Sequence, residues 1–123
     1  MTISPCRSLF AEFMGTAMLV GVVIGSGIMG DTLSQDTAIA LWGNTAATGA
    51  ILVVLILILG PISGAHFNPA VTLAFRLRGD ISTALMCGYI VAQIVGGCAG
   101  AILANIMFDL PAIDFPFFAD QSE

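Results

Sequence analysis

The sequence predicts an all-α membrane protein with three transmembrane helices and one re-entrant half-helix. Hydrophobic residues make up 58% of the chain, whereas Asp, Glu, Lys and Arg together make up 9%. Soluble domains carry about 25% charged residues, so this chain cannot cover a surface that faces water. The few charges are grouped, and the gaps between the groups are long enough to cross a bilayer. The middle gap, residues 37–75, is interrupted by glycine and proline residues, and this interruption predicts the half-helix.

The composition also excludes other classes of protein. The mean hydropathy of +1.02 is too high for a disordered chain. The net charge of −5 without a basic cluster argues against nucleic-acid binding. With His66 as its single histidine and no catalytic grouping, we expect neither an enzyme nor a bound metal or cofactor. Cys6, Cys87 and Cys98 have no C-x-x-C spacing, and we interpret the last two as small hydrophobic residues.

The first span is predicted over residues 8–30. The uncharged run from Phe13 to Gly30 is longer than the apolar core of a usual signal peptide, and no clear A-x-A cleavage site follows it. We therefore interpret this run as a retained helix, followed by a polar connection between Asp31 and Asp36. The sequence also predicts a second span over residues 38–59 and a third span over 81–108. An acidic, proline-containing tail or linker follows over residues 109–123.

The uncharged segment from Thr37 to Phe75 is the most informative part of the sequence. One span needs about 20 residues, so the segment is too long for one span and barely long enough for two. Breaks are predicted at Gly60-Pro61, after the run that ends at Leu59, and again at Ser63-Gly64 and Asn68-Pro69. Beyond the last break remain about ten helical residues, roughly 15 Å of helix, which is half of a hydrocarbon core. We therefore predict a re-entrant loop and half-helix over residues 60–78.

The positions of the arginines favour this layout over a full fourth span. Arg7 precedes the first span, and Arg76 and Arg78 follow the half-helix. With a re-entrant segment all three lie on one side of the membrane, whereas a fourth crossing would separate them. The positive-inside rule then predicts a cytoplasmic N-terminus and a C-terminus outside. We expect an integral protein of the plasma (inner) membrane.

The residues of the predicted loop suit a polar path through the membrane. Irregular backbone at membrane depth is tolerated where it lines a wet cavity or is buried in protein. Asn68 is predicted as the N-cap of the half-helix and Pro69 as its first residue. The helix N-terminus would repel cations and offer N–H donors to a neutral, oxygen-bearing solute. From the spacing alone, a buried helix that simply starts at Asn68 remains an alternative.

Three motifs resemble those of the aquaporin and glycerol-facilitator family. The segment SGAHFNPAVT at Ser63–Thr72 is similar to the first Asn-Pro-Ala box of that family. Its first-helix signature is similar to AEFMGT at Ala11–Thr16, and its third helix to GYIVAQIVGG at Gly88–Gly97. The family fold has six spans and two half-helices in two inverted repeats. Residues 1–108 resemble the first repeat only, which is half of an aquaporin-like inverted-repeat bundle.

The resemblance implies a role for each matching residue. Asn68 would donate its side-chain amide to the solute at the middle of the pore, and Pro69 and Ala70 would lock the half-helix start against its counterpart. Glu12 would be a buried carboxylate that holds loop N–H groups, with Gln93 in a comparable polar role on the third helix. Backbone carbonyls would line the cytoplasmic half of the pore, and they belong to Gly64, Ala65, His66 and Phe67.

Two of these assignments have alternatives, and one position departs from the family pattern. Glu12 lies close enough to the membrane edge to snorkel, and His66 could gate the pore by titration. Thr48 aligns with the second-helix position of the family's selectivity filter, where an aromatic residue is typical. A threonine would leave the filter wider and more polar, which favours larger neutral solutes such as glycerol or metalloid acids.

The family's second Asn-Pro-Ala box and its filter arginine have no counterpart in the sequence. We therefore expect a second repeat as a partner, besides the lipid bilayer, water and small neutral solutes. An antiparallel second copy conflicts with the one-sided arginines, so we favour a longer or separate chain as its source. The family also implies a tetramer as a possible assembly. A nonconducting fragment and a generic three-span assembly subunit are the alternative functions.

Overall fold

A computed structural model describes residues 4–113 of the chain. These residues form four α-helices and no strand: α1 (Pro5–Leu33), α2 (Thr37–Ser63), α3 (Pro69–Leu77) and α4 (Thr83–Met107). Three of them, α1, α2 and α4, are long and apolar enough to cross a membrane, whereas α3 has nine residues. The prediction of an all-α fold with three spans and one short helix is confirmed. Of the predicted tail, residues 109–113 are not helical and residues 114–123 lie outside the described part.

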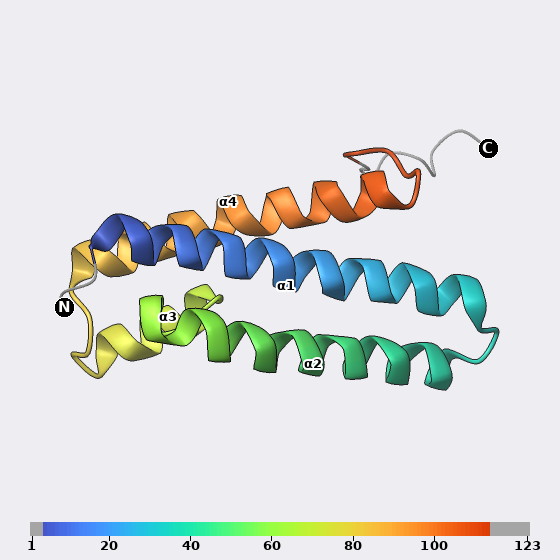
Figure 1. Cartoon of the computed structure of the whole chain (residues 1–123), viewed down its shortest axis with the longest axis horizontal. Helices are drawn as coiled ribbons and strands as arrows, with labels where there is room; N and C mark the ends of the chain where they lie inside the picture. Colours follow the sequence, from blue (N-terminus) through green and yellow to red (C-terminus); the bar gives the residue numbers. More distant parts are fainter. Residues whose placement is uncertain (1–3, 114–123) are drawn as a thin grey trace, which may run out of the picture.

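The first helix is the centre of the bundle. α1 lies between α2 and α4 and packs along both, whereas the backbones of α2 and α4 do not pack closely against each other within residues 4–113 (Figure 1). α2 runs antiparallel to α1, and α4 runs parallel to it (Figure 1). The α2–α3 loop enters the bundle from the end where α2 stops, and α3 returns to that same end (Figure 1). The path from α2 to α4 is therefore re-entrant and adds no full crossing.

The close approach of α1 and α4 depends on glycine. A Cβ at Gly96 would overlap the carbonyl oxygen of Phe13, and a Cβ at Gly100 would overlap the carbonyl oxygen of Ala17. On the other helix, a Cβ at Gly21 would lie 3.5 Å from the carbonyl oxygen of Gly100. Small residues permit such backbone contact between membrane helices, where dispersion replaces the hydrophobic effect as the main attraction. These glycines hold α4 in place beside α1.

The end of α2 differs from the predicted break at Gly60-Pro61, because the helix continues to Ser63. Pro61 lies in the last turn, where a missing N–H removes one hydrogen bond and the helix is about to end. Two hydroxyl groups from other helices compensate by binding the last carbonyl groups. Ser8 Oγ donates to the carbonyl of Ile62 at 2.9 Å, and Tyr89 Oη donates to that of Ser63 at 2.7 Å.

The first helix is also longer than its predicted span of residues 8–30. It continues through Asp31 to Leu33, and the Thr32 hydroxyl donates to the carbonyl of Ile28 one turn earlier. The connection to α2 shortens to residues 34–36, where Asp36 caps α2 by accepting from the N–H of Ala38 at 2.8 Å. The Thr32 side chain binds its own helix and so supports this extension beyond the apolar run.

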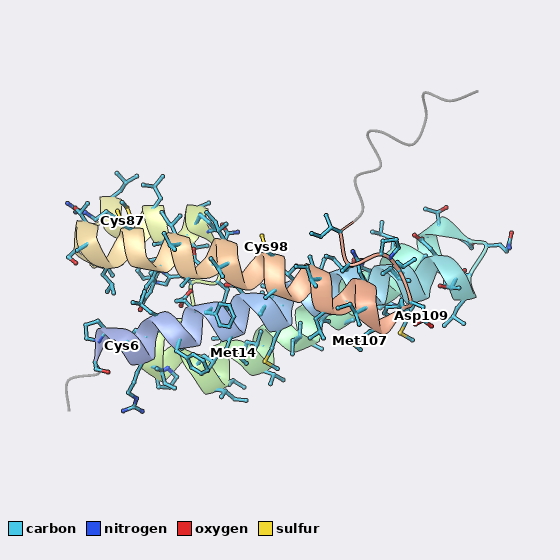
Figure 2. All side chains as sticks on the ribbon, turned by 90° about the horizontal axis from the view of Figure 1, so that it is seen from above. Cys6, Met14, Cys87, Cys98, Met107 and Asp109 are labelled. Atoms are coloured by element: carbon cyan, nitrogen blue, oxygen red, sulfur yellow. The ribbon has the colours of Figure 1, made fainter. Side chains whose placement is uncertain are left out.

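The three cysteines are free and exposed, Cys6 on α1 and Cys87 and Cys98 on α4 (Figure 2). Most of α2 is also exposed, since only Ala40 and Leu55 of this helix are buried. Large apolar side chains are exposed on all three long helices, for example Met18 on α1, Leu57 on α2 and Val95 on α4, so this surface suits contact with lipid.

Candidate functional site

The irregular segment between α2 and α3 has a strained backbone. Gly64 has φ +90°, and Ala65 and Phe67 have φ +54° and +50°. The left-handed region suits glycine, but it costs residues with a Cβ of the order of 1–3 kcal/mol each. Such a conformation persists only where surrounding contacts hold it.

The carboxylate of Glu12 supplies those contacts. Its Oε1 accepts from the Ser63 hydroxyl at 2.6 Å and from the N–H of His66 at 3.0 Å. Its Oε2 accepts from the N–H of Phe67 at 2.7 Å and from the side-chain amide of Gln93 at 2.9 Å. The side chain is 0% exposed, so it does not extend to the membrane edge. Four charge-assisted hydrogen bonds compensate for the burial of a charge, and the two from the N–H groups of His66 and Phe67 tie the loop to α1.

The first-helix motif also provides the space for the loop. Phe67 is buried, and its ring lies where a Cβ at Gly15 would be. Glu12 and Gly15 are three residues apart and so lie on the same face of α1. This face therefore binds the loop twice, through its backbone N–H groups and through the Phe67 ring.

A second group of contacts joins the loop and α3 to α4. Gln93 Nε2 donates to Thr72 Oγ1 at 2.8 Å, and Thr72 Oγ1 lies 3.1 Å from Nδ1 of His66. The His66 ring packs against Phe75 with a centroid distance of 4.4 Å and against Tyr89 at 5.2 Å. The His66 side chain is thus buried between α3 and α4.

The N–H groups and the carbonyl groups of the loop are used differently. The N–H groups of His66 and Phe67 bind Glu12, and that of Ala65 binds the Ser63 hydroxyl at 3.1 Å. In contrast, the carbonyl groups of residues 64–67 accept no hydrogen bond from any other residue within 4–113. The loop therefore offers a short row of free acceptors. They belong to the four residues whose backbone carbonyl groups are predicted to line the pore: Gly64, Ala65, His66 and Phe67.

The half-helix begins as the Asn-Pro pair predicts. Asn68 is the N-cap, with φ −155° and ψ 128°, and its Oδ1 accepts from the N–H of Ala70 at 2.8 Å. Pro69 is the first helical residue, where its missing N–H costs nothing. Since the cap uses the oxygen, the Asn68 amide keeps its N–H₂ group free of any partner in the described chain. Asn68, Pro69 and Ala70 are all exposed.

Thr48 lies apart from the loop, on α2, roughly 22 Å along the helix from Ser63. Its hydroxyl donates to Oδ1 of Asn44 at 3.2 Å, and Nδ2 of Asn44 donates to the carbonyl of Val23 on α1 at 3.3 Å. Asn44 was not among the predicted site residues, although an asparagine within an apolar span is a recognisable signal.

Sequence reasoning also assigned no role to Ser63, Thr72 or Tyr89, although all three lie within the quoted motifs. Each of these side chains binds a residue of another motif: Ser63 binds Glu12, Thr72 binds Gln93, and Tyr89 binds the carbonyl of Ser63. These partners are 21 or more positions away, so one motif alone does not reveal what each side chain binds. Within the described residues, no three His, Cys, Asp or Glu side chains are grouped as a metal ion would require.

Comparison with known proteins places these features in a family. The Major intrinsic protein family matches residues 1–117. The chain is 56% identical over 108 residues to aquaglyceroporin AqpS of Rhizobium meliloti (strain 1021), covering 88% of this chain and 46% of that protein. It is 36% identical over 104 residues to aquaporin NIP1-1 of Arabidopsis thaliana, covering 85% and 34%. It is 34% identical over 105 residues to the glycerol uptake facilitator protein of Streptococcus pneumoniae (strain ATCC BAA-255 / R6), covering 83% and 44%.

The chain spans less than half the length of these relatives. The family match includes all three motifs and all four helices, so the resemblance drawn from the motifs is confirmed. Members of the family are membrane channels and not enzymes, in agreement with the prediction for this chain. This integral membrane chain belongs to the major intrinsic protein family and corresponds to an N-terminal half of its members.

Proposed function

We propose that this chain forms one half of a membrane channel for water and small neutral solutes such as glycerol. The observation that carries the proposal is the arrangement at residues 64–68, where a row of free carbonyl groups leads to the free amide of Asn68. The names of two relatives, an aquaglyceroporin and a glycerol uptake facilitator, agree with this class of solute.

The arrangement suits neutral solutes that carry hydroxyl groups. The carbonyl groups of residues 64–67 accept hydrogen bonds from a passing molecule, and the Asn68 N–H₂ group donates to its oxygen. The N-terminus of α3 carries a partial positive charge, which disfavours cations at this position. A molecule such as water or glycerol can exchange bonds with both kinds of group.

The other half of the pore is a second repeat. The exposure of Asn68, Pro69 and Ala70 supports this part of the proposal, because a matching half-helix would cover them. In this arrangement Pro69 and Ala70 pack against that half-helix, and Glu12 and Gln93 keep the loop in place. The second repeat comes from a C-terminal half of the same protein, another chain or a second copy, and complete pores assemble as tetramers.

The finer selectivity of the channel is assigned to Thr48. A threonine at the filter position favours larger neutral solutes, glycerol or metalloid acids, over strict water selectivity. Its hydroxyl hydrogen is engaged with Asn44, so its oxygen is left to accept a hydrogen bond from a solute.

We further propose that the N-terminus is cytoplasmic and the end of α4 is outside, in the plasma (inner) membrane. Arg7, Arg76 and Arg78 lie at one end of the bundle, as the positive-inside rule requires of the cytoplasmic end (Figure 1). An impermeant maleimide should label a Cys6-only variant in inverted vesicles and spare it in intact cells. The opposite labelling pattern would reverse the assignment.

The second candidate is a fragment that inserts into the membrane but conducts nothing by itself, and that needs the second repeat in trans. The same exposed residues 68–70 favour it, since a half-helix without its counterpart leaves one end of the pore unlined. A generic three-span assembly subunit is the third, and it predicts that Asn68 has no influence on flux.

The test is water and glycerol flux in liposomes that contain the purified chain alone, the chain with a separately expressed second repeat, or no protein. Asn68→Asp keeps the cap oxygen and removes the N–H₂ donor, so it separates a pore role from a helix-cap role. Asn105→Asp in α4 is the matched control. Flux that requires the second repeat and falls with Asn68→Asp supports a channel half, and flux from the chain alone supports pairing of two copies. Absence of flux in both preparations, with inserted protein, rejects the channel.

A further inference from the structure

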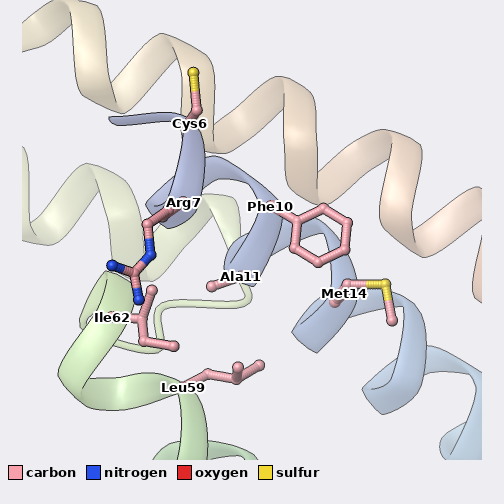
Figure 3. A pocket seen from close by; sticks show the side chains of 7 residues that line it. All are labelled: Cys6, Arg7, Phe10, Ala11, Met14, Leu59 and Ile62. Carbon is pink, nitrogen blue, oxygen red and sulfur yellow. The ribbon is translucent and has the colours of Figure 1, made fainter. Parts of the chain in front are cut away.

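A groove opens on the outer side of the bundle, between the first turns of α1 and the last turn of α2 (Figure 3). Its volume is about 380 Å³. Cys6, Phe10 and Met14 of α1 form one wall, and Leu59 and Ile62 of α2 form the other. The bond from Ser8 to the carbonyl of Ile62 joins the two helices beside it. No residue of the 64–70 segment lines this groove.

One charged side chain belongs to this otherwise apolar groove. The Arg7 guanidinium extends from α1 toward Ile62 at the end of α2 (Figure 3). Arg7 is exposed, and it forms no ion pair within residues 4–113. Arg78, at the same end of the bundle, instead binds Asp80 at 3.2 Å and lies over the Phe75 ring. Arg7 therefore offers a positive charge that no acidic side chain of the described chain neutralises.

The depth of the groove matches that of a lipid in one leaflet. Arg7 lies in the first turn of a helix that crosses the membrane, where a long basic side chain reaches the headgroup level. Met14 lies two turns farther along α1, about 10 Å deeper. An occupant must then be anionic at the membrane surface and apolar below it.

We propose that this groove binds an anionic phospholipid. Its phosphate binds the Arg7 guanidinium, whose planar fork suits phosphate oxygens. One acyl chain lies along Phe10, Met14 and Leu59 toward the middle of the bilayer. The site is separate from the proposed pore, so it stands whether or not the chain conducts.

The charges of the chain argue against a second parallel copy as the occupant. Glu12 is buried and fully engaged, Asp80 is paired, and Asp31, Asp36 and Asp109 lie at the other end of the bundle. A parallel neighbour would therefore bring no free carboxylate of residues 4–113 to Arg7. A phospholipid provides both the anion and the apolar chain.

The test compares two arginine variants of the purified chain in detergent. Native mass spectrometry measures retention of phosphatidylglycerol and of phosphatidylcholine with identical acyl chains. We expect the wild type to prefer phosphatidylglycerol, and Arg7→Gln to lower that affinity roughly tenfold or more, as loss of a charge-assisted bond implies. Arg78→Gln removes the same charge at the same end and should change the affinity by less than about twofold. Equal loss in both variants, or no preference in the wild type, would overturn the proposal.

A second measurement uses the cysteines as reporters and tests the acyl chain. Cys6 lines the groove, whereas Cys98 lies near the middle of α4, away from it (Figure 2). Phosphatidylglycerol should slow maleimide modification of Cys6 but not of Cys98, and Arg7→Gln should abolish that protection. Glycerol 3-phosphate, the headgroup without a chain, should give no protection. Protection by glycerol 3-phosphate alone would indicate an anion site without a lipid groove and would contradict the proposal.

Discussion

The carboxylate of Glu12 and the side-chain amide of Gln93 meet inside the bundle, 2.9 Å apart, and join α1 to α4. Both side chains also hold the re-entrant segment, Glu12 through the N–H groups of His66 and Phe67 and Gln93 through Thr72. One polar contact between two spans therefore positions both the loop and the half-helix. The loop that carries the proposed pore groups depends on residues that do not face a pore themselves.

Replacing Glu12 by glutamine should destabilise the protein. The amide would turn an N–H₂ group toward two of the four donors that the carboxylate now accepts, and each unsatisfied buried donor costs about 1–3 kcal/mol. We expect the free energy of unfolding in mixed micelles to fall by about 2–4 kcal/mol. Asp31→Asn, at the exposed end of α1, is the control. Equal stability of the two variants would show that the carboxylate does not hold the loop.

Alanine at Gly96 or Gly100 should separate α1 from α4. The added methyl group would overlap the carbonyl oxygens of Phe13 or Ala17, and overpacking of this kind costs about 1–3 kcal/mol. The matched control is Gly49→Ala in α2, where an added Cβ meets no atom within 4 Å. That variant should be as stable as the wild type or slightly more stable, because alanine favours helix. Denaturant titration in micelles distinguishes them, and a tolerated Gly100→Ala would argue against the close crossing.

The helix-cap role of Asn68 should be measurable without any flux. Asn68→Ala removes the oxygen that accepts from the Ala70 N–H and should cost about 1 kcal/mol of stability. Asn68→Asp keeps such an oxygen and should retain the stability of the wild type. Thermal unfolding of the purified variants checks both values. If aspartate destabilised the chain as much as alanine, the effect of Asn68→Asp on flux would no longer report on the pore.

An aromatic residue at position 48 should narrow the proposed filter. In the channel completed by its second repeat, we expect Thr48→Phe to lower glycerol flux relative to water flux, because the larger ring leaves less room and removes the hydroxyl acceptor. Thr45→Phe places the same ring on an exposed position of α2, one turn away, and should leave the ratio unchanged. Stopped-flow measurements of both solutes give the ratio. A similar change in both variants would mean that Thr48 does not face the pore.

Local patterns in the sequence were sufficient for the number and order of the elements. Gaps between charged groups located the three spans, because a charge inside the hydrocarbon core is costly and therefore rare. The Asn68-Pro69 pair located the start of the half-helix, because the cap oxygen and the proline ring act within one turn. The arginines predicted a re-entrant path without a fourth crossing, and the path of α2, α3 and α4 has this form (Figure 1).

Contacts between helices were decided by the tertiary structure alone. Glu12 binds residues 51 to 81 positions away, and which donors reach it depends on how α1 and α4 are rotated and where they cross. The same rotation joins Asn44 to the backbone of Val23 and brings Tyr89 to the end of α2, which explains why that helix passes Pro61. Periodicity specifies which face of a helix is apolar, but these spans are apolar around most of their circumference, apart from single residues such as Glu12 and Gln93. The sequence by itself therefore determined the elements and their sidedness relative to one another, and close packing of glycine against backbone determined which polar groups meet.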